Sequence, residues 1–293
     1  MKNTDKQALY TSAETMALLG ISSSTLRSLV EKELIKKVTR PGYTHGRYTK
    51  ESVDQYHRQQ LLFEEKYTLD NEEEIKREDE RSLTKMSKIE TIEDMKEVQD
   101  LSQEIFGVGA GTEKERMKIV EKNPDTYYIL RKGKEAIGYL STMPLKKGNL
   151  ENILGQTLPV KVEPDQIEKF EKGKKIDLYL TAIGVKPGFS TEEKHEYGSR
   201  LVRQLIKLIL ELGRRGVEIG NIAARSSMPD GIRLMKHIGF TEVIPLTPER
   251  RTFIINIEES GIPFVLQYKK LLEESKISDF SEIAKITSEK VKP

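Results

Sequence analysis

The sequence predicts an α+β chain: a small N-terminal helical domain with a β-hairpin, an acidic helical linker, and a larger mixed α/β domain around a central twisted sheet. Its 293 residues are about twice the size of a typical domain. Residues 1–60 carry ten Lys and Arg against six Asp and Glu, whereas residues 61–85 carry five against nine. From residue 85 onward, strand-like and helix-like patterns alternate. We therefore expect domains at 1–60 and 85–260, a linker at 61–84 and a helical tail at 261–293.

Composition excludes several classes of protein. The chain has no cysteine, which excludes disulfides, thiolate metal sites and cysteine nucleophiles. No run of apolar residues approaches the ~20 that span a bilayer, and the polar N-terminus lacks the apolar stretch of a signal peptide. We therefore expect a cytoplasmic, nucleoid-associated protein without a membrane partner. We also expect no metal site, because no two of the four histidines stand four residues apart: His45, His57, His195 and His237.

The first 35 residues have the pattern of two short helices joined by a tight turn. Thr11 and Glu14 form a capping box, Gly20 suits the end of a helix, and Ser22 can begin the next one. In this second helix, Leu26 and Leu29 are spaced to face inward. Two helices around a glycine-containing turn predict a helix-turn-helix unit.

The exposed side of this unit has residues suited to DNA. Small hydroxyls and one guanidinium on the second helix fit a major groove, and a Gly-rich hairpin after Ile35 predicts a basic wing. The candidate contacts are Ser23, Ser24, Thr25, Arg27 and Ser28 on the helix and Arg40, His45, Arg47 and Tyr48 on the wing. The alternative is a small helical bundle that binds protein.

Residues 10–56 resemble the MerR/excisionase-type winged helix-turn-helix family. The resemblance lies in Tyr10-Thr11, Leu19-Gly20-Ile21-Ser22, Thr25-Leu26-Arg27, Leu34-Ile35 and Arg47-Tyr48. It implies that Arg27 and Arg47 contact phosphates and that Tyr48 either packs the wing or touches the DNA backbone. Since one such module grips few phosphates, we expect double-stranded DNA as the partner and a homodimer on adjacent half-sites.

The C-terminal domain resembles the GNAT acyltransferase fold over residues 85–258. The resemblance lies in Gly231–Phe240, as a last helix with its terminal Gly-Phe, and in Ile183-Gly184-Val185-Lys186-Pro187, as the end of a central strand. It implies that backbone amides at Ile183, Gly184 and Val185 receive the pantetheine arm of acetyl-CoA. It also implies that the following loop, aligned at Gly198, Ser199 and Arg200, cradles the diphosphate.

The chemistry expected from that family is mostly missing. Glu193 and Glu196 stand where the family has Arg or Gln and the first Gly, and Met235 replaces the usual tyrosine acid. Ser190 and Glu193 form a capping box, which predicts that the helix begins early and occupies the loop. An alignment through His195, Gly198 and Arg200 is the alternative. We therefore expect no cofactor, with acetyl-CoA left open, and assign no catalytic residue; Tyr179 and Tyr197 are the remaining candidate acids.

The leading functional hypothesis is a sequence-specific DNA-binding protein, a transcriptional regulator. Its GNAT-like domain would be catalytically degenerate and serve dimerisation, binding of a protein partner, or sensing. One alternative is an active acetyl-CoA-dependent N-acetyltransferase that carries a DNA-binding domain. Another is an excisionase-like accessory factor for recombination or plasmid maintenance.

Overall fold

The computed structural model describes residues 9–19, 21, 23–31, 33–39, 46–57, 83–107, 111–156, 161–246 and 250–290. For Ser24, Thr25, Ser28 and residues 278–290 it describes the backbone alone. The chain divides into two compact units, one of residues 1–68 with 258–266 and one of residues 69–257 with 267–293. Most of the predicted acidic linker, 61–84, lies outside the described residues.

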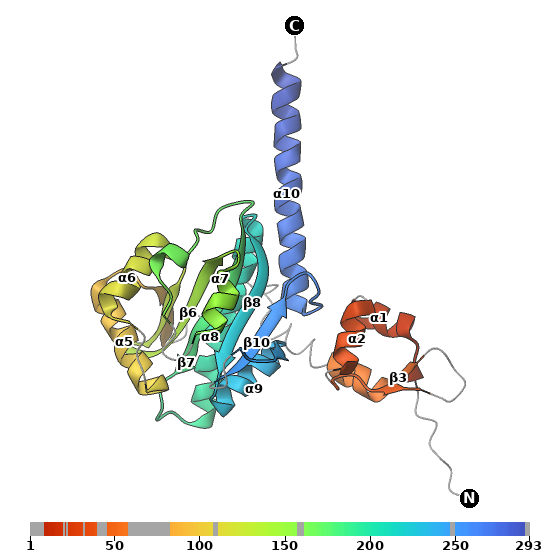
Figure 1. The fold of residues 1–293 in the computed structure, drawn as a ribbon, viewed down its shortest axis with the longest axis horizontal. Helices are drawn as coiled ribbons and strands as arrows, with labels where there is room; N and C mark the ends of the chain where they lie inside the picture. Colours follow the sequence, from red (N-terminus) through yellow and green to blue (C-terminus); the bar gives the residue numbers. More distant parts are fainter. Residues whose placement is uncertain are drawn as a thin grey trace, which may run out of the picture. The chain divides into compact units, whose positions relative to one another are not determined.

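The N-terminal unit combines short helices with a small sheet (Figure 1). Helices α1 (Ser12–Leu19) and α2 (Ser23–Glu31) are followed by a helical stretch at 50–57. Strands β1 (Leu9–Tyr10), β2 (Lys37–Val38) and β3 (Arg47–Thr49) form an antiparallel sheet in the order β1-β3-β2. The predicted capping box is present, since the Thr11 amide donates to Glu14 Oε2 (2.7 Å) and the Glu14 amide to Thr11 Oγ1 (3.2 Å). The core is Leu19, Ile21, Leu26, Leu29, Ile35, Tyr48 and Val53.

The second unit is built on a seven-stranded mixed sheet in the order β4-β5-β6-β7-β8-β10-β9, in which only β7 and β8 are parallel. This is the mixed α/β unit with a central sheet that the sequence predicts. Its strands are β4 (Thr84–Lys88), β5 (Tyr127–Lys132), β6 (Glu135–Lys146), β7 (Lys175–Val185), β8 (Glu218–Ser226), β9 (Thr241–Val243) and β10 (Arg251–Asn256). Its helices are α5 (Ile92–Phe106), α6 (Glu113–Lys122), α7 (Asn149–Leu154), the 3-10 turn η2 (Pro164–Gln166), α8 (Thr191–Arg214) and α9 (Pro229–Ile238).

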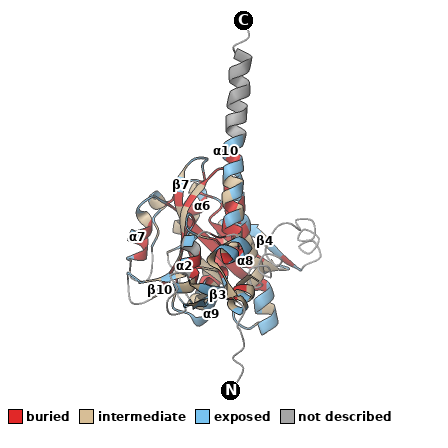
Figure 2. Ribbon diagram, turned by 90° about the vertical axis from the view of Figure 1, so that its right-hand side faces the viewer, coloured by how far each residue is buried: buried red, intermediate tan, exposed pale blue. Residues whose placement is uncertain are grey.

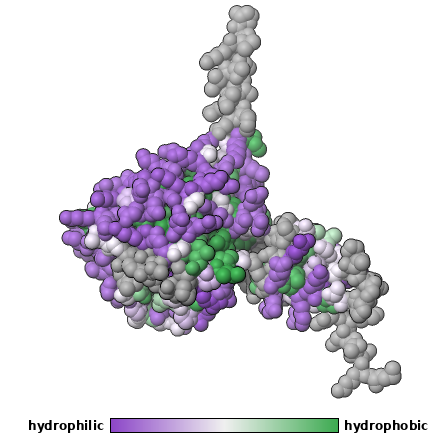
Figure 3. Space-filling model, in the orientation of Figure 1, coloured by the Kyte–Doolittle hydropathy of each residue, from purple (hydrophilic) through white to green (hydrophobic). Residues whose placement is uncertain are grey.

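Helices cover the sheet on both faces. Helices α5, α6 and α7 share one apolar core with alternate residues of the strands, among them Ile129, Tyr139 and Tyr179. Successive strand residues point to opposite faces, so Gly138 faces away from this core, and a Cβ there would lie 3.4 Å from Leu201 of α8. Burial is accordingly concentrated in the strands and in the inward sides of the helices (Figure 2). Hydrophilic residues dominate the visible surface of this unit (Figure 3).

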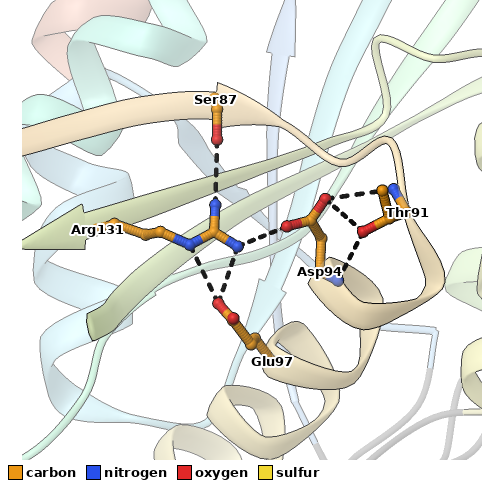
Figure 4. A network of polar contacts seen from close by, with 5 residues as sticks. All are labelled: Ser87, Thr91, Asp94, Glu97 and Arg131. Atoms are coloured by element: carbon orange, nitrogen blue, oxygen red, sulfur yellow. Dashed lines mark hydrogen bonds and ion pairs between the residues drawn. The ribbon is translucent and has the colours of Figure 1, made fainter. Parts of the chain in front are cut away.

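A polar network fixes the start of α5 to the sheet (Figure 4). Arg131 of β5 donates from Nη2 to Asp94 Oδ1 (2.7 Å) and to Glu97 Oε2 (2.8 Å), and from Nη1 to Ser87 of β4 (3.3 Å). Asp94 also forms the capping box of α5 with Thr91. Burial disfavours its charge, but the hydrogen bonds from Thr91 and Arg131 outweigh that effect and hold the pKa of Asp94 below its ordinary value.

The structure corrects two details of the predicted elements. The amphipathic patterns at 263–272 and 280–286 predict two separate helices in the tail, but both stretches belong to a single helix, α10 (Pro263–Lys290). The Tyr268 hydroxyl ties this helix to the sheet, because it donates to the Val217 carbonyl (2.8 Å) and accepts from the Ile219 amide (2.7 Å). The pattern of residues 145–175 predicts a long polar connection with one short helix at 164–171. The structure instead has the helix α7 near the start of this connection, and only the turn η2 within 164–171.

Candidate functional site

In the N-terminal unit, the two candidate arginines are exposed. Arg27 lies on α2 and Arg47 on β3, and Ser23 is exposed at the start of α2. Tyr48 differs, since it is only 7% exposed and belongs to the core of this unit. Of its two predicted roles, its side chain therefore packs the hairpin and is not available to a DNA backbone.

For five other residues predicted to contact DNA, the side chains lie outside the described part of the structure. The backbone of Ser24, Thr25 and Ser28 lies in α2, but their side chains lie outside the described residues. Arg40 and His45, expected at the tip of the hairpin, lie wholly outside them. The winged helix-turn-helix identity of this unit is untested and stays a prediction.

In the second unit, strand β7 parts from β8 halfway along its length. The parallel ladder between them ends at Leu180 and Ala224, whereas β7 continues to pair with β6 as far as Val185. At the same point the β6–β7 register shifts, because Ser141 pairs with Ala182 while Thr142 pairs with Leu180. Thr181 is thus the extra residue of a β-bulge. Bulges of this kind are frequent beside functional sites.

The bulge determines which backbone amides face the open edge. The Lys186 amide donates to the Ile137 carbonyl (2.9 Å), and bonds to one neighbour recur at every second residue of an antiparallel strand. The amide of Gly184 therefore faces β6, while those of Ile183 and Val185 face the edge that β8 has left. Two of the three predicted pantetheine contacts are thus suitably placed, and the prediction for the Gly184 amide does not fit.

Gly184 has a different structural reason to be glycine. A Cβ at this position would lie 2.9 Å from Ile105 and 3.1 Å from Phe106, both at the end of α5. Contacts this short require a neighbouring atom to move. The residue lets α5 approach the separated end of β7.

The N-terminus of α8 is capped by the side chains of Ser190 and Glu193. Ser190 is the N-cap: its hydroxyl accepts from the Glu193 amide (3.2 Å), and its amide donates to Glu193 Oε2 (3.1 Å). Lys132 of β5 lies 3.3 Å from the other Glu193 oxygen. The bond from the Ser190 backbone and the neighbouring Lys132 ammonium hold the pKa of Glu193 below its ordinary value. A carboxylate therefore occupies the helix end where a diphosphate would need amide donors.

Gly198, Ser199 and Arg200 lie within α8 and not in a loop. The helix begins at Thr191, and its bonding starts with the Lys194 amide donating to the Ser190 carbonyl (3.0 Å). Backbone N–H groups of later residues in an α-helix are used by carbonyls four residues earlier. Their backbone amides therefore belong to the helix and not to a phosphate-binding loop, while the predicted contact with a coenzyme diphosphate stays a prediction. The early helix start expected from the Ser190 capping box is observed.

The candidate proton donors do not assemble into a site. Met235, which stands where the family has its tyrosine acid, is 3% exposed and has no proton to donate. Tyr179 and Tyr197 are each 3% exposed, and the Tyr197 hydroxyl is directed at Glu193 Oε1 (3.4 Å). No catalytic residue is assigned. Sequence reasoning missed Lys132, whose contact with Glu193 joins residues 61 positions apart and leaves no local pattern.

The described part of the chain offers neither a metal site nor a membrane span. No group of three or more His, Asp or Glu side chains there is arranged to hold a metal ion. None of the helices in that part combines the length with the apolar composition that crossing a bilayer requires.

Comparison with known proteins gives structural similarities only. No family model matches the chain, and no curated protein matches it. Among solved structures, the loading GNATL domain of CurA from Lyngbya majuscula is 14% identical with a TM-score of 0.46, over 60% of this chain and 99% of that one. The PaiA N-acetyltransferase from Thermoplasma acidophilum, in complex with coenzyme A, is 10% identical with a TM-score of 0.40, over 59% and 98%.

The ribosomal-protein-S18-alanine N-acetyltransferase from Escherichia coli is 19% identical with a TM-score of 0.36, over 58% of this chain and 90% of that one. Identities below 20% and TM-scores below 0.5 say nothing about the activity of this chain. Its chemistry has to be judged from its own residues.

Proposed function

We propose that this protein is a sequence-specific DNA-binding protein of the transcriptional-regulator class. The observation that supports it most is the placement of Arg27 and Arg47. Both are exposed, one on α2 and the other on β3, in a unit whose order of helices and hairpin is that expected of a winged helix-turn-helix. The net charge of +4 over residues 1–60 would favour a polyanion.

The proposal includes a homodimer. One small unit with few cationic side chains would neutralise few phosphates, and its affinity would fall steeply with salt. Two copies on half-sites one helical turn apart would double the contacts. The second unit and α10 are the candidates for the dimer contact.

Selection from a random duplex library tests the proposal. The full chain should enrich one motif, and Arg27→Ala or Arg47→Ala should weaken binding to it and reduce the salt dependence by about one phosphate contact each. Both variants should keep the melting temperature, because both side chains are exposed. Arg233→Ala, which removes the same charge from an exposed side chain on α9 of the other unit, is the matched control.

Two outcomes would contradict the proposal. One is a library that enriches no motif and yields only weak binding. The other is an arginine variant that unfolds, since that would make the side chain structural. Equal losses in Arg233→Ala would mean that overall charge and not the N-terminal unit carries the binding.

We further propose that the second unit is a GNAT-like domain that has lost its coenzyme diphosphate site. The departure of β7 from β8 supports the fold, and the capped start of α8 supports the loss. The second candidate function, an active acetyltransferase, is favoured by the Ile183 and Val185 amides alone. Titration calorimetry with acetyl-CoA separates the two: no heat is expected at micromolar ligand, and micromolar binding with transfer of the acetyl group would establish the enzyme instead.

A further inference from the structure

A cavity of about 220 Å³ lies beside the bulge of β7, on the face of the sheet covered by α5 and α6. Its walls are the first turns of α6, residues of β5, β6 and β7, and the segment 161–164. An apolar cavity of about 150 Å³ holds benzene, so this one has room for a single ring with a short substituent. It lies within the second unit and takes no part in the proposed DNA binding.

The hydroxyl groups around the cavity are already hydrogen-bonded within the protein. The Thr181 hydroxyl donates to the Ser141 carbonyl (3.1 Å) and lies 2.8 Å from the Ser141 hydroxyl. The Ser141 side chain is also hydrogen-bonded to Tyr127, and the Ser102 side chain to Tyr139. Polar groups that have partners within the protein lose little when a ligand displaces water beside them. A ligand therefore does not have to supply hydrogen bonds to these four side chains.

The charged side chains of the lining are paired with one another, engaged within the protein, or exposed. Lys161 Nζ lies 3.3 Å from Glu115 Oε1 and 3.0 Å from Glu163 Oε1. Arg116, which is buried, also has an interaction within the protein, and Lys118 is exposed. A charged ligand would lose its hydration on entering the cavity and would have to compete with these contacts. The lining therefore favours a ligand without charge.

The rest of the wall is apolar and includes two aromatic rings. Its members are Ile119, Tyr127, Tyr139, Met143, Val162 and Ala182. Burial raises the pKa of Tyr139 to about 12 and raises that of Tyr127 as well, so both phenol groups are neutral at physiological pH. Aromatic pairs and contacts between sulfur and an aromatic ring stabilise a complex beyond the area that they bury. The two tyrosines and Met143 therefore favour an aromatic ring as the occupant.

We propose that this cavity binds a small neutral aromatic molecule. The ring would pack on Tyr127, Tyr139 and Met143, and a short uncharged substituent would lie toward the half-exposed side chains of residues 161–163. Such a ligand leaves the hydrogen bonds and ion pairs of the lining intact. A carboxylate or an ammonium compound of the same shape is disfavoured, because it would lose its hydration and compete with the ion pairs of Lys161.

Three probes of similar shape and different charge test the proposal on the full chain. Benzyl alcohol, benzoate and benzylamine are titrated separately, with binding followed by calorimetry and by the methyl resonances of the methionines. Benzyl alcohol should bind with a Kd of about 1 mM or tighter, and its ring current should shift the methyl resonance of Met143. Benzoate and benzylamine should bind at least tenfold more weakly.

Variants then locate the site. Ala182→Leu fills part of the cavity and should weaken benzyl alcohol at least tenfold, while Ala17→Leu, which adds the same atoms at an exposed position of α1, leaves the Kd unchanged. If Ala182→Leu fails to fold, Val162→Asp places a charge in the wall at a partly exposed position and should weaken benzyl alcohol at least fivefold. The proposal is overturned if benzyl alcohol does not bind, if benzoate or benzylamine binds as tightly, or if a folded variant at residue 182 or 162 binds benzyl alcohol with undiminished affinity.

Discussion

Only residues 186–190 separate the end of β7 from the start of α8, yet the two regions differ in whether their backbone amides are capped. At the end of β7, the backbone leaves β8 and directs two amides at the open edge. At the start of α8, the amides are closed by Ser190 and Glu193. The first region thus leaves backbone amides without a strand partner, whereas the second caps its amides with its own side chains.

This difference shows which interactions determine the path of β7 and which determine the start of α8. The path of β7 depends on packing between distant elements, because α5 lies against Gly184 while the Gly184 carbonyl closely approaches Gly138 of β6. The start of α8 depends on four consecutive residues that form a capping box. A few local substitutions can therefore change the start of α8 while the sheet beside it stays intact.

Gly138→Ala should lower the free energy of unfolding the most, because it disturbs the packing that determines the path of β7. A Cβ at this position would lie 2.7 Å from the Gly184 carbonyl oxygen and 3.3 Å from Val185 Cα. Both are backbone atoms, so the strands must move apart. We expect the free energy of unfolding to fall by about 2–3 kcal/mol, measured by urea denaturation with an unchanged slope.

Gly133→Ala is not a suitable control, because Gly133 has a positive φ of 61° and would be strained for another reason. Gly198→Ala, discussed below, is the appropriate comparison, since it adds the same methyl group in open space. A Gly138→Ala protein as stable as the wild type would mean that β6 and β7 can separate freely. Packing would then not explain the path of β7.

Ser190→Ala should lower the stability less, and its effect should be confined to the start of α8. Loss of an N-cap hydroxyl costs about 1 kcal/mol, and the melting temperature should fall by a few degrees. Thr191→Ala, which removes an exposed hydroxyl next to the capping box, is the matched control. If Ser190→Ala leaves the melting temperature unchanged while it improves binding of coenzyme A, the cap hinders the coenzyme and does not stabilise the helix.

Gly198→Ala should raise stability. Gly198 lies inside α8 and an added Cβ would meet no atom within 4 Å, so the change removes the helix penalty of glycine, about 0.5–1 kcal/mol. A thermal melt measures the gain. A decrease would be expected only if this glycine allowed a close backbone approach, as a phosphate-binding loop requires.

The sequence predicts the start of α8 better than it predicts the path of β7. The capping boxes at Thr11 and Ser190 are visible because their partners stand three residues apart, and both are present. The bulge at Thr181 is invisible, since nothing in strand 176–185 distinguishes a regular ladder from one with an extra residue. The sequence leaves two roles open for Tyr48, because its ring suits both a hairpin core and a DNA surface, and only tertiary packing decides between them.

The cavity of about 220 Å³ beside the bulge of β7 could not be predicted for the same reason. Its lining comes from α6, β5, β6, β7 and the segment 161–164, and no two of those segments form a sequence motif. Only the pairing order of the sheet brings the three strands together at this point.

The smallest expected effect is a pH dependence at the start of α8. The pKa of Glu193 is lowered by the Ser190 backbone bond and by Lys132. A carboxylate with a lowered pKa in the folded state stabilises the protein above its unfolded-state pKa, and this contribution is lost as pH falls through the folded-state value. Glu193→Gln should therefore be less stable than the wild type near neutrality. The two unfolding curves should converge in acid, below the ordinary glutamate range near about pH 4, because the wild-type side chain is then neutral too. A difference that persists in acid would assign the stabilisation to hydrogen-bond geometry and not to the charge that excludes a diphosphate.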